Sequence, residues 1–194
     1  MRAFLSSTGA YPMRILVRVI LGLVALLVVL AGIGFFLPKE WSVEQSISVQ
    51  APPERIHPFI ETPTQWAAWT VWNKERYPDM TQRFVGPERG KGASWSWTGE
   101  STGNGTMTIT GSDPAKGITF DLQFEDFPVV EGAIRLEKEG AATRVIWAMD
   151  GTVHDDPLSR WFARIMGPMM KGDLQGGLEK LKAQAESTPA VAAE

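Results

Sequence analysis

The sequence predicts an α+β fold in which an antiparallel sheet packs around a long C-terminal helix, preceded by one transmembrane helix. Three observations predict it. A continuous apolar run lies near the N-terminus, short segments of alternating apolar and polar residues follow, and the C-terminal segment has apolar residues at helical spacing. A sheet with one apolar face must be covered, and only the C-terminal helix is long enough to cover it.

Composition limits the class of protein. The chain has 194 residues, 44% apolar and 21% charged, which is typical of a packed globular domain. The absence of cysteine excludes disulfides and thiolate metal sites, and two distant histidines, His57 and His154, do not suggest a zinc site. We therefore expect no cofactor and no metal. After Pro38 there are 16 basic and 22 acidic residues, and such an acidic domain lacks the positive surface of a nucleic-acid binder.

The apolar run predicts a membrane anchor. Val19 to Leu37 contains no charged or strongly polar side chain, and nineteen helical residues span about 28 Å, close to the hydrocarbon thickness of a bilayer. A cleaved signal peptide is the alternative, but its apolar core is usually shorter, and this run does not end in a small-residue cleavage site. Arg2, Arg14 and Arg18 precede the run, so the positive-inside rule predicts a cytoplasmic N-terminus and a domain on the outer side of the membrane, periplasmic if the source is bacterial. The expected organisation is a short N-terminal segment (1–14), the anchor (15–37), one domain (39–185) and a disordered tail (186–194).

The domain begins with a strand and a helical pair. Apolar and polar residues alternate from Trp41 to Val49, which predicts a strand with one face in water. The segment 51–54, Ala-Pro-Pro-Glu, predicts the start of a helix because proline is tolerated in a first turn. Trp66, Trp69 and Trp72 then follow three residues apart. These indoles either fill the core at one end of the sheet or rest at the bilayer interface, where tryptophan is enriched.

The remaining segments predict strands and then one helix. Further strands are expected over Thr81–Val85, Ala93–Thr98, 106–110, Ile118–Phe124, Val129–Glu137 and Thr143–Asp150. Asp155-Asp156-Pro157 predicts the start of the last helix, with acidic side chains at the positive end of its dipole. We expect this helix to reach about Ala185, with a bend or an interruption at Gly167-Pro168.

Several of these segments resemble a known superfamily. The motifs are Ile47-Ser-Val-Gln-Ala-Pro-Pro-Glu54, the three spaced tryptophans, Gly86-Pro-Glu88 with Gly90-Lys-Gly-Ala93, and Thr143–Gly151. In this order they are similar to the SRPBCC (START-like, helix-grip) superfamily, polyketide cyclase/dehydrase-like branch, over Trp41 to Lys182. The resemblance implies a cavity between the curved sheet and the long helix that holds apolar ligands such as lipids, sterols or polyketides. It implies no shared catalytic residues, because its members include carriers as well as cyclases.

The candidate ligand-binding residues are bulky apolar side chains expected on the covered sheet face and methionines on the last helix. They are Trp95, Trp97, Met107, Phe120, Trp147 and Met149 on the sheet, with Met166, Met169 and Met170 on the helix. Methionine adapts its shape to varied apolar ligands. The alternative is that the same residues fill an ordinary core. The faces are assigned by unbroken alternation, and one β-bulge would invert part of a strand.

No catalytic residue is expected. The sequence has no Gly-x-Ser-x-Gly elbow, no phosphate-binding glycine loop and no His-Glu-x-x-His helix, and both histidines are expected at the surface. The first hypothesis is a membrane-anchored domain that binds a hydrophobic small molecule or lipid without catalysis. The alternatives are a polyketide cyclase/dehydrase-like enzyme, which needs a titratable group in the cavity, and a protein-interaction module with a filled core.

Overall fold

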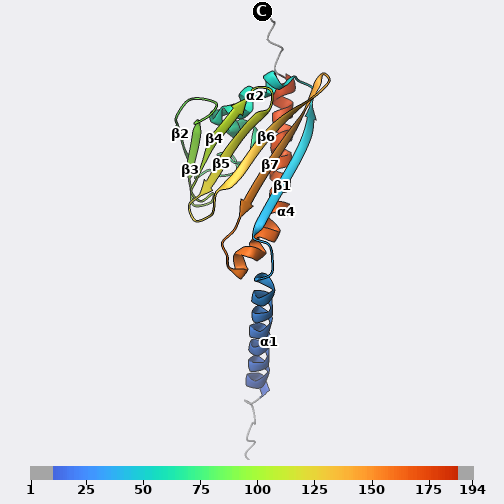
Figure 1. Ribbon diagram of the computed structural model, residues 1–194. Helices are drawn as coiled ribbons and strands as arrows, with labels where there is room; N and C mark the ends of the chain where they lie inside the picture. Colours follow the sequence, from blue (N-terminus) through green and yellow to red (C-terminus); the bar gives the residue numbers. More distant parts are fainter. Residues whose placement is uncertain (1–10, 188–194) are drawn as a thin grey trace, which may run out of the picture.

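The computed structural model describes residues 11–187 (Figure 1). Helix α1 (Tyr11–Gly34) extends away from the domain, and its segment Met13–Gly34 is long and apolar enough to cross a membrane. It ends before Leu37 because residues 35–37 form a turn, in which the Leu37 N–H donates to the Gly34 carbonyl at 3.2 Å. Within the expected terminal segments, residues 1–10 and 188–194 lie outside the described residues. Residues 11–14 are already part of α1, and residues 186–187 are the end of the last helix, not part of a tail.

In the described part of the chain, seven antiparallel strands form one sheet in the order β1-β7-β6-β5-β4-β3-β2. The strands are β1 (Glu40–Val49), β2 (Thr81–Val85), β3 (Ser94–Thr98), β4 (Gly105–Asp113), β5 (Gly117–Phe124), β6 (Val130–Glu139) and β7 (Ala142–Thr152). Strand β1 pairs with β7 over the whole length of β1, from Glu40 opposite Thr152 to Val49 opposite Thr143. This pairing brings the start of the domain beside the segment that enters the last helix. The strand pattern predicted from alternation is therefore confirmed.

Helix α4 (Pro157–Ser187) lies along the concave side of the sheet and packs mainly on β1, while the short helices α2 (Pro53–Glu61), η1 (Pro63–Gln65) and α3 (Trp66–Trp69) cover the rest (Figure 1). The helix is not interrupted at Gly167-Pro168, contrary to one of the two outcomes expected there. Gly167 lies against β1, where an added Cβ would be 2.8 Å from the Ser42 carbonyl oxygen. The glycine therefore permits close approach of the helix to the sheet.

The tryptophan series is part of the core and not a bilayer contact. Trp66 and Trp69 are buried, and Trp72 is half-buried. The Trp66 indole N–H donates to the Ile60 carbonyl at 2.9 Å, and the Trp69 N–H donates to the Phe59 carbonyl at 3.2 Å. These two hydrogen bonds hold α3 against α2. All three rings pack against Trp147 of β7, with ring centroids 5.2–6.0 Å apart.

Candidate functional site

The six predicted sheet residues come together around a very small interior void. All six side chains are buried, and they enclose this void with Trp66, Trp72, Leu122 and Phe124. Its volume is about 30 Å³, which leaves room for a group about the size of one water. The sheet half of the predicted lining is therefore assembled in one place, but the aromatic rings leave no space for a whole ligand.

Aromatic packing explains why this part of the core is filled. Trp66 lies edge-on to Phe120 at 5.3 Å, and Trp95 lies 5.0 Å from Trp97. The Phe120 ring rests on Gly132 of β6, where an added Cβ would be 2.2 Å from the ring. A side chain at position 132 would displace the ring, so this glycine lets the aromatic layer sit directly on the sheet.

The three helix methionines line a second, larger space. A cavity of about 410 Å³ lies between α4 and the open end of the sheet, within the usual range for small-molecule sites. Met149, Leu122 and Phe124 border both spaces, so the cavity lies directly next to the void. We call this larger space the ligand cavity. Its lining is Trp41, Trp72, Arg76, Leu122, Phe124, Phe127, Pro128, Val130, Met149, Thr152, Val153, Phe162, Met166, Met169, Met170 and Asp173.

Several lining residues of the ligand cavity were not predicted. Phe127 and Pro128 come from the loop between β5 and β6, which gives no periodic signal. Phe162 had a usable signal, because Phe162, Met166 and Met170 recur every four residues and so share one face of α4. A four-residue spacing rule applied to the methionines would have found it.

The ligand cavity contains one charge pair. Arg76 Nη1 lies 2.8 Å from Asp173 Oδ1, and these two residues are the charged members of the cavity lining. The hydrogen bond to Asp173 raises the pKa of Arg76 above its ordinary value. Both side chains are partly exposed, so the pair lies at a solvent-exposed edge of the cavity, and the other lining residues are uncharged.

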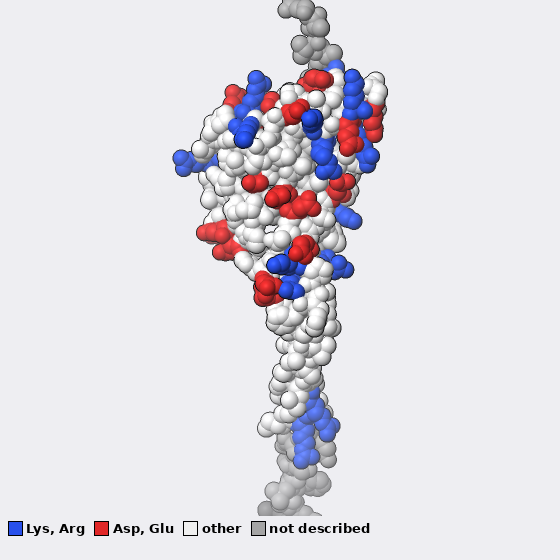
Figure 2. Space-filling view, in the orientation of Figure 1, with Lys and Arg blue, Asp and Glu red and all other residues white. Residues whose placement is uncertain are grey.

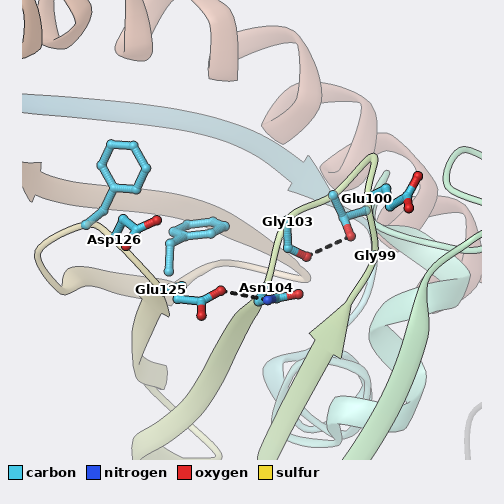
Figure 3. Close-up of a pocket in the computed structure, with 9 residues that line it drawn as sticks. Gly99, Glu100, Gly103, Asn104, Glu125 and Asp126 are labelled. Atoms are coloured by element: carbon cyan, nitrogen blue, oxygen red, sulfur yellow. Dashed lines mark hydrogen bonds between the residues drawn. The ribbon is translucent and has the colours of Figure 1, made fainter.

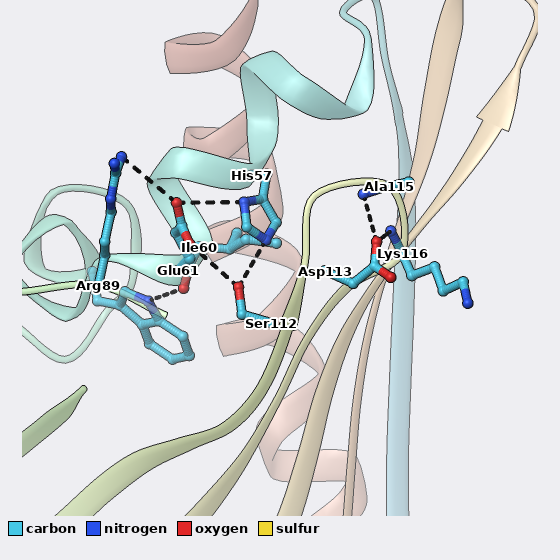
Figure 4. Close-up of polar contacts among 9 residues, drawn as sticks. His57, Ile60, Glu61, Arg89, Ser112, Asp113, Ala115 and Lys116 are labelled. Carbon is cyan, nitrogen blue, oxygen red and sulfur yellow. Dashed lines mark hydrogen bonds and ion pairs between the residues drawn. The ribbon is translucent and has the colours of Figure 1, made fainter. Parts of the chain in front are cut away.

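The expectation that both histidines lie at the surface is wrong for His57. This side chain is 3% exposed on α2, with Nδ1 3.5 Å from Glu61 Oε1 and Nε2 3.1 Å from the Ser112 hydroxyl (Figure 4). Burial lowers the pKa of His57, and the nearby Glu61 carboxylate opposes this only in part. The sequence held a usable signal, because His57 lies three residues before Ile60 and therefore shares the buried face of α2 with it. His154 is exposed, as expected.

The domain also has an open groove outside the ligand cavity. An open groove of about 590 Å³ lies between the β3–β4 and β5–β6 loops, where Asn104 Nδ2 donates to Glu125 Oε2 at 2.6 Å (Figure 3). Its polar loops, including Glu100 and Asp126, make it a poorer site for an apolar ligand than the ligand cavity.

Among residues 11–187, no group of three or more histidine, aspartate or glutamate side chains is placed to hold a metal ion.

The sequence matches a family model over almost the whole domain. Residues 40–186 match the family described as polyketide cyclase / dehydrase and lipid transport. The chain belongs to this family. The match begins at the first residue of β1 and includes all seven strands and nearly all of α4.

Solved structures show the same fold at low sequence identity. The Zhui aromatase/cyclase from Streptomyces sp. R1128 is 14% identical, with a TM-score of 0.55, over 80% of this chain and 99% of that one. The Aha1 dimer from Colwellia psychrerythraea is 17% identical, with a TM-score of 0.53, over 75% and 96%. A protein from Thermus thermophilus is 16% identical, with a TM-score of 0.53, over 74% and 96%. No curated protein matches the sequence.

Proposed function

We propose that this protein is a membrane-anchored binding protein that holds a hydrophobic small molecule or lipid, without catalysis, in the ligand cavity. The observation that carries the proposal is the cavity itself, about 410 Å³ in volume, with 14 uncharged residues among its 16 lining residues. Burial of apolar ligand surface supplies about 25 cal/mol per Å² before the entropic cost of binding. The three methionines on α4 allow the lining to fit ligands of different shape.

Contacts between α1 and α4 support a cavity mouth beside the membrane. The Trp161 indole N–H donates to the Leu30 carbonyl at 3.0 Å, and the Arg160 guanidinium donates to the Leu37 carbonyl at 3.0 Å. Leu30 lies four residues before the end of α1, about 6 Å along the helix axis. The first turn of α4 therefore runs beside the final turn of the apolar helix.

Exposed apolar side chains occur at the same end of the domain. Leu158 is 80% exposed and Met169 is 62% exposed, and Phe162 and Ile165 are also exposed on α4. Figure 2 shows α1 without charge between the domain and its N-terminal end, where Arg14 and Arg18 lie. With α1 in a bilayer, Leu158 and Phe162 near the start of α4 lie close to the bilayer surface, and Phe162 also lines the cavity, which gives an apolar ligand a short path from lipid. The arginines favour a cytoplasmic N-terminus and a domain on the outer side.

An enzymatic role is the second candidate. Catalysis in this cavity would have to use Arg76 and Asp173, the charged residues of its lining, and these already neutralise each other at 2.8 Å. A proton-transfer step needs a group that is free to accept or release a proton near neutral pH. The ion pair therefore favours binding over cyclase chemistry.

The test is native mass spectrometry of the full chain in lipid nanodiscs, after incubation with a lipid extract of its host. We expect a discrete adduct on the wild-type protein. Met166→Glu, which adds a charge to the cavity lining, should abolish it, because a carboxylate is costly among apolar groups. Ala183→Glu is the matched control, because it adds the same charge at an exposed position of α4 outside the lining. An adduct that is equally abundant on Met166→Glu and wild type would contradict the proposed site.

A further inference from the structure

Within residues 11–187, two indole N–H groups in the core have no hydrogen-bond partner. They are the Nε1 atoms of Trp95 and Trp147, both buried, and both side chains line the interior void. The neighbouring Trp66 also lines the void, but its N–H donates to the Ile60 carbonyl at 2.9 Å. A buried donor without a partner is unfavourable, and most such donors in proteins are paired. The two unpaired donors therefore require an acceptor that the described residues, 11–187, do not supply.

The ring of Trp147 is oriented with its N–H edge away from α4. Its Cζ3 atom faces Gly177, where an added Cβ would be 2.9 Å away. Nε1 lies on the opposite edge of the indole, so this donor points away from Gly177. Trp147 and Trp95 lie on strands at different positions in the sheet, and the void of about 30 Å³ is the space that both side chains share.

The void lies at the inner end of the ligand cavity. Trp72, Leu122, Phe124 and Met149 line both spaces. Met149 is unbranched and flexible, so a change of its rotamer can join the two. A ligand in the cavity can then place one small group in the void, which has room for about one oxygen-sized group.

We propose that the ligand carries a neutral hydrogen-bond acceptor at its buried end, such as a carbonyl or ester oxygen, which accepts from the N–H groups of Trp95 and Trp147. This inference rests on the proposed function. The acceptor is neutral because none of the ten residues that line the void is charged, and a carboxylate there would have no cationic partner. A pure hydrocarbon end would fill the space but leave both donors unpaired.

Two isosteric probes test this directly in the full chain in nanodiscs, with empty nanodiscs as the reference. The probes are 2-acetylnaphthalene and 2-isopropenylnaphthalene, which differ in having C=O or C=CH₂ at the same place. Isothermal titration calorimetry should give about tenfold tighter binding of the ketone, which corresponds to about 1.4 kcal/mol. In a second readout, infrared spectroscopy should show the ketone carbonyl band at the lower frequency of a hydrogen-bonded carbonyl.

Substitutions then assign the donors. Trp147→Phe and Trp95→Phe should each reduce the ketone preference towards equal binding, while Trp66→Phe, in the same void but with a paired N–H, should leave it unchanged. Equal binding of both probes to wild type would overturn this inference and leave the proposed function standing, as expected if a trapped water pairs the donors. Binding of neither probe would contradict both. The wild-type ratio remains decisive if a variant does not fold.

Discussion

The two buried tryptophans, Trp66 and Trp147, should respond differently to the same substitution. Each is replaced by phenylalanine, which removes the indole N–H and part of the ring. Both rings are buried, and each has three aromatic neighbours with centroids within 6.0 Å, so the loss of packing is similar. The two indole N–H groups differ in their hydrogen bonding. Trp66→Phe leaves the Ile60 carbonyl without its indole donor, whereas Trp147→Phe removes a donor that is already unpaired.

The expected difference follows from the cost of an unpaired buried group, about 1–3 kcal/mol. Trp66→Phe should lower the free energy of unfolding by about 1–3 kcal/mol more than Trp147→Phe does. For a domain of this size about 1 kcal/mol corresponds to about 2–4 °C, so the melting temperatures should differ by about 2–12 °C. Thermal unfolding of the full chain in mild detergent, monitored by near-ultraviolet circular dichroism, measures this difference in melting temperature. If Trp147→Phe is as destabilising as Trp66→Phe, the Trp147 N–H is paired and our reasoning about the void is wrong.

Three further predictions concern His57 and two glycines of α4. Because burial lowers the pKa of His57 below 6.5, the folded protein binds fewer protons than the unfolded chain, and stability should fall as the pH drops through about 6.5 towards the folded-state pKa. His57→Gln should flatten this part of a stability–pH curve while His154→Gln keeps it, and a flat wild-type curve would refute the assignment. Gly172→Ala should stabilise the exposed face of α4 by about 1 kcal/mol, since nothing lies within 4 Å of the added Cβ. Gly167→Ala should lower the melting temperature because the added Cβ meets the Ser42 carbonyl at 2.8 Å, and an unchanged value would show that the helix can move away.

Much of the sheet was predictable because alternation reports directly which side chains share a face. Trp95, Trp97 and Met107 are buried together as the pattern predicted. The β-bulge that could have inverted these faces does exist, between Ile109 and Gly111 on β4, but it lies beyond Met107 and leaves that residue's face unchanged. A face assigned from alternation stays correct for the residues that precede a bulge.

The division of the predicted lining into two spaces was not predictable from alternation. Whether Trp147 and Phe120 surround a ligand or fill a core depends on how the α3 tryptophans pack against them, which is a property of the folded molecule. The position of the larger cavity depends on Phe127 and Pro128, loop residues whose place is set by the turn between two strands. The apolar periodicity of the sequence predicts neither the packing of the α3 tryptophans nor the position of these loop residues.

Photolabelling of the full chain in nanodiscs with the methyl ester of a diazirine fatty acid, followed by peptide mapping, tests most directly whether an apolar ligand binds inside the domain. Lipid around α1 labels α1 in any case, so the informative residue is Met149, which is 1% exposed and lines the ligand cavity. We expect label on Met149 and Met170 that an excess of the unlabelled methyl ester displaces. Label confined to α1 and the exposed Leu158 would contradict binding inside the domain.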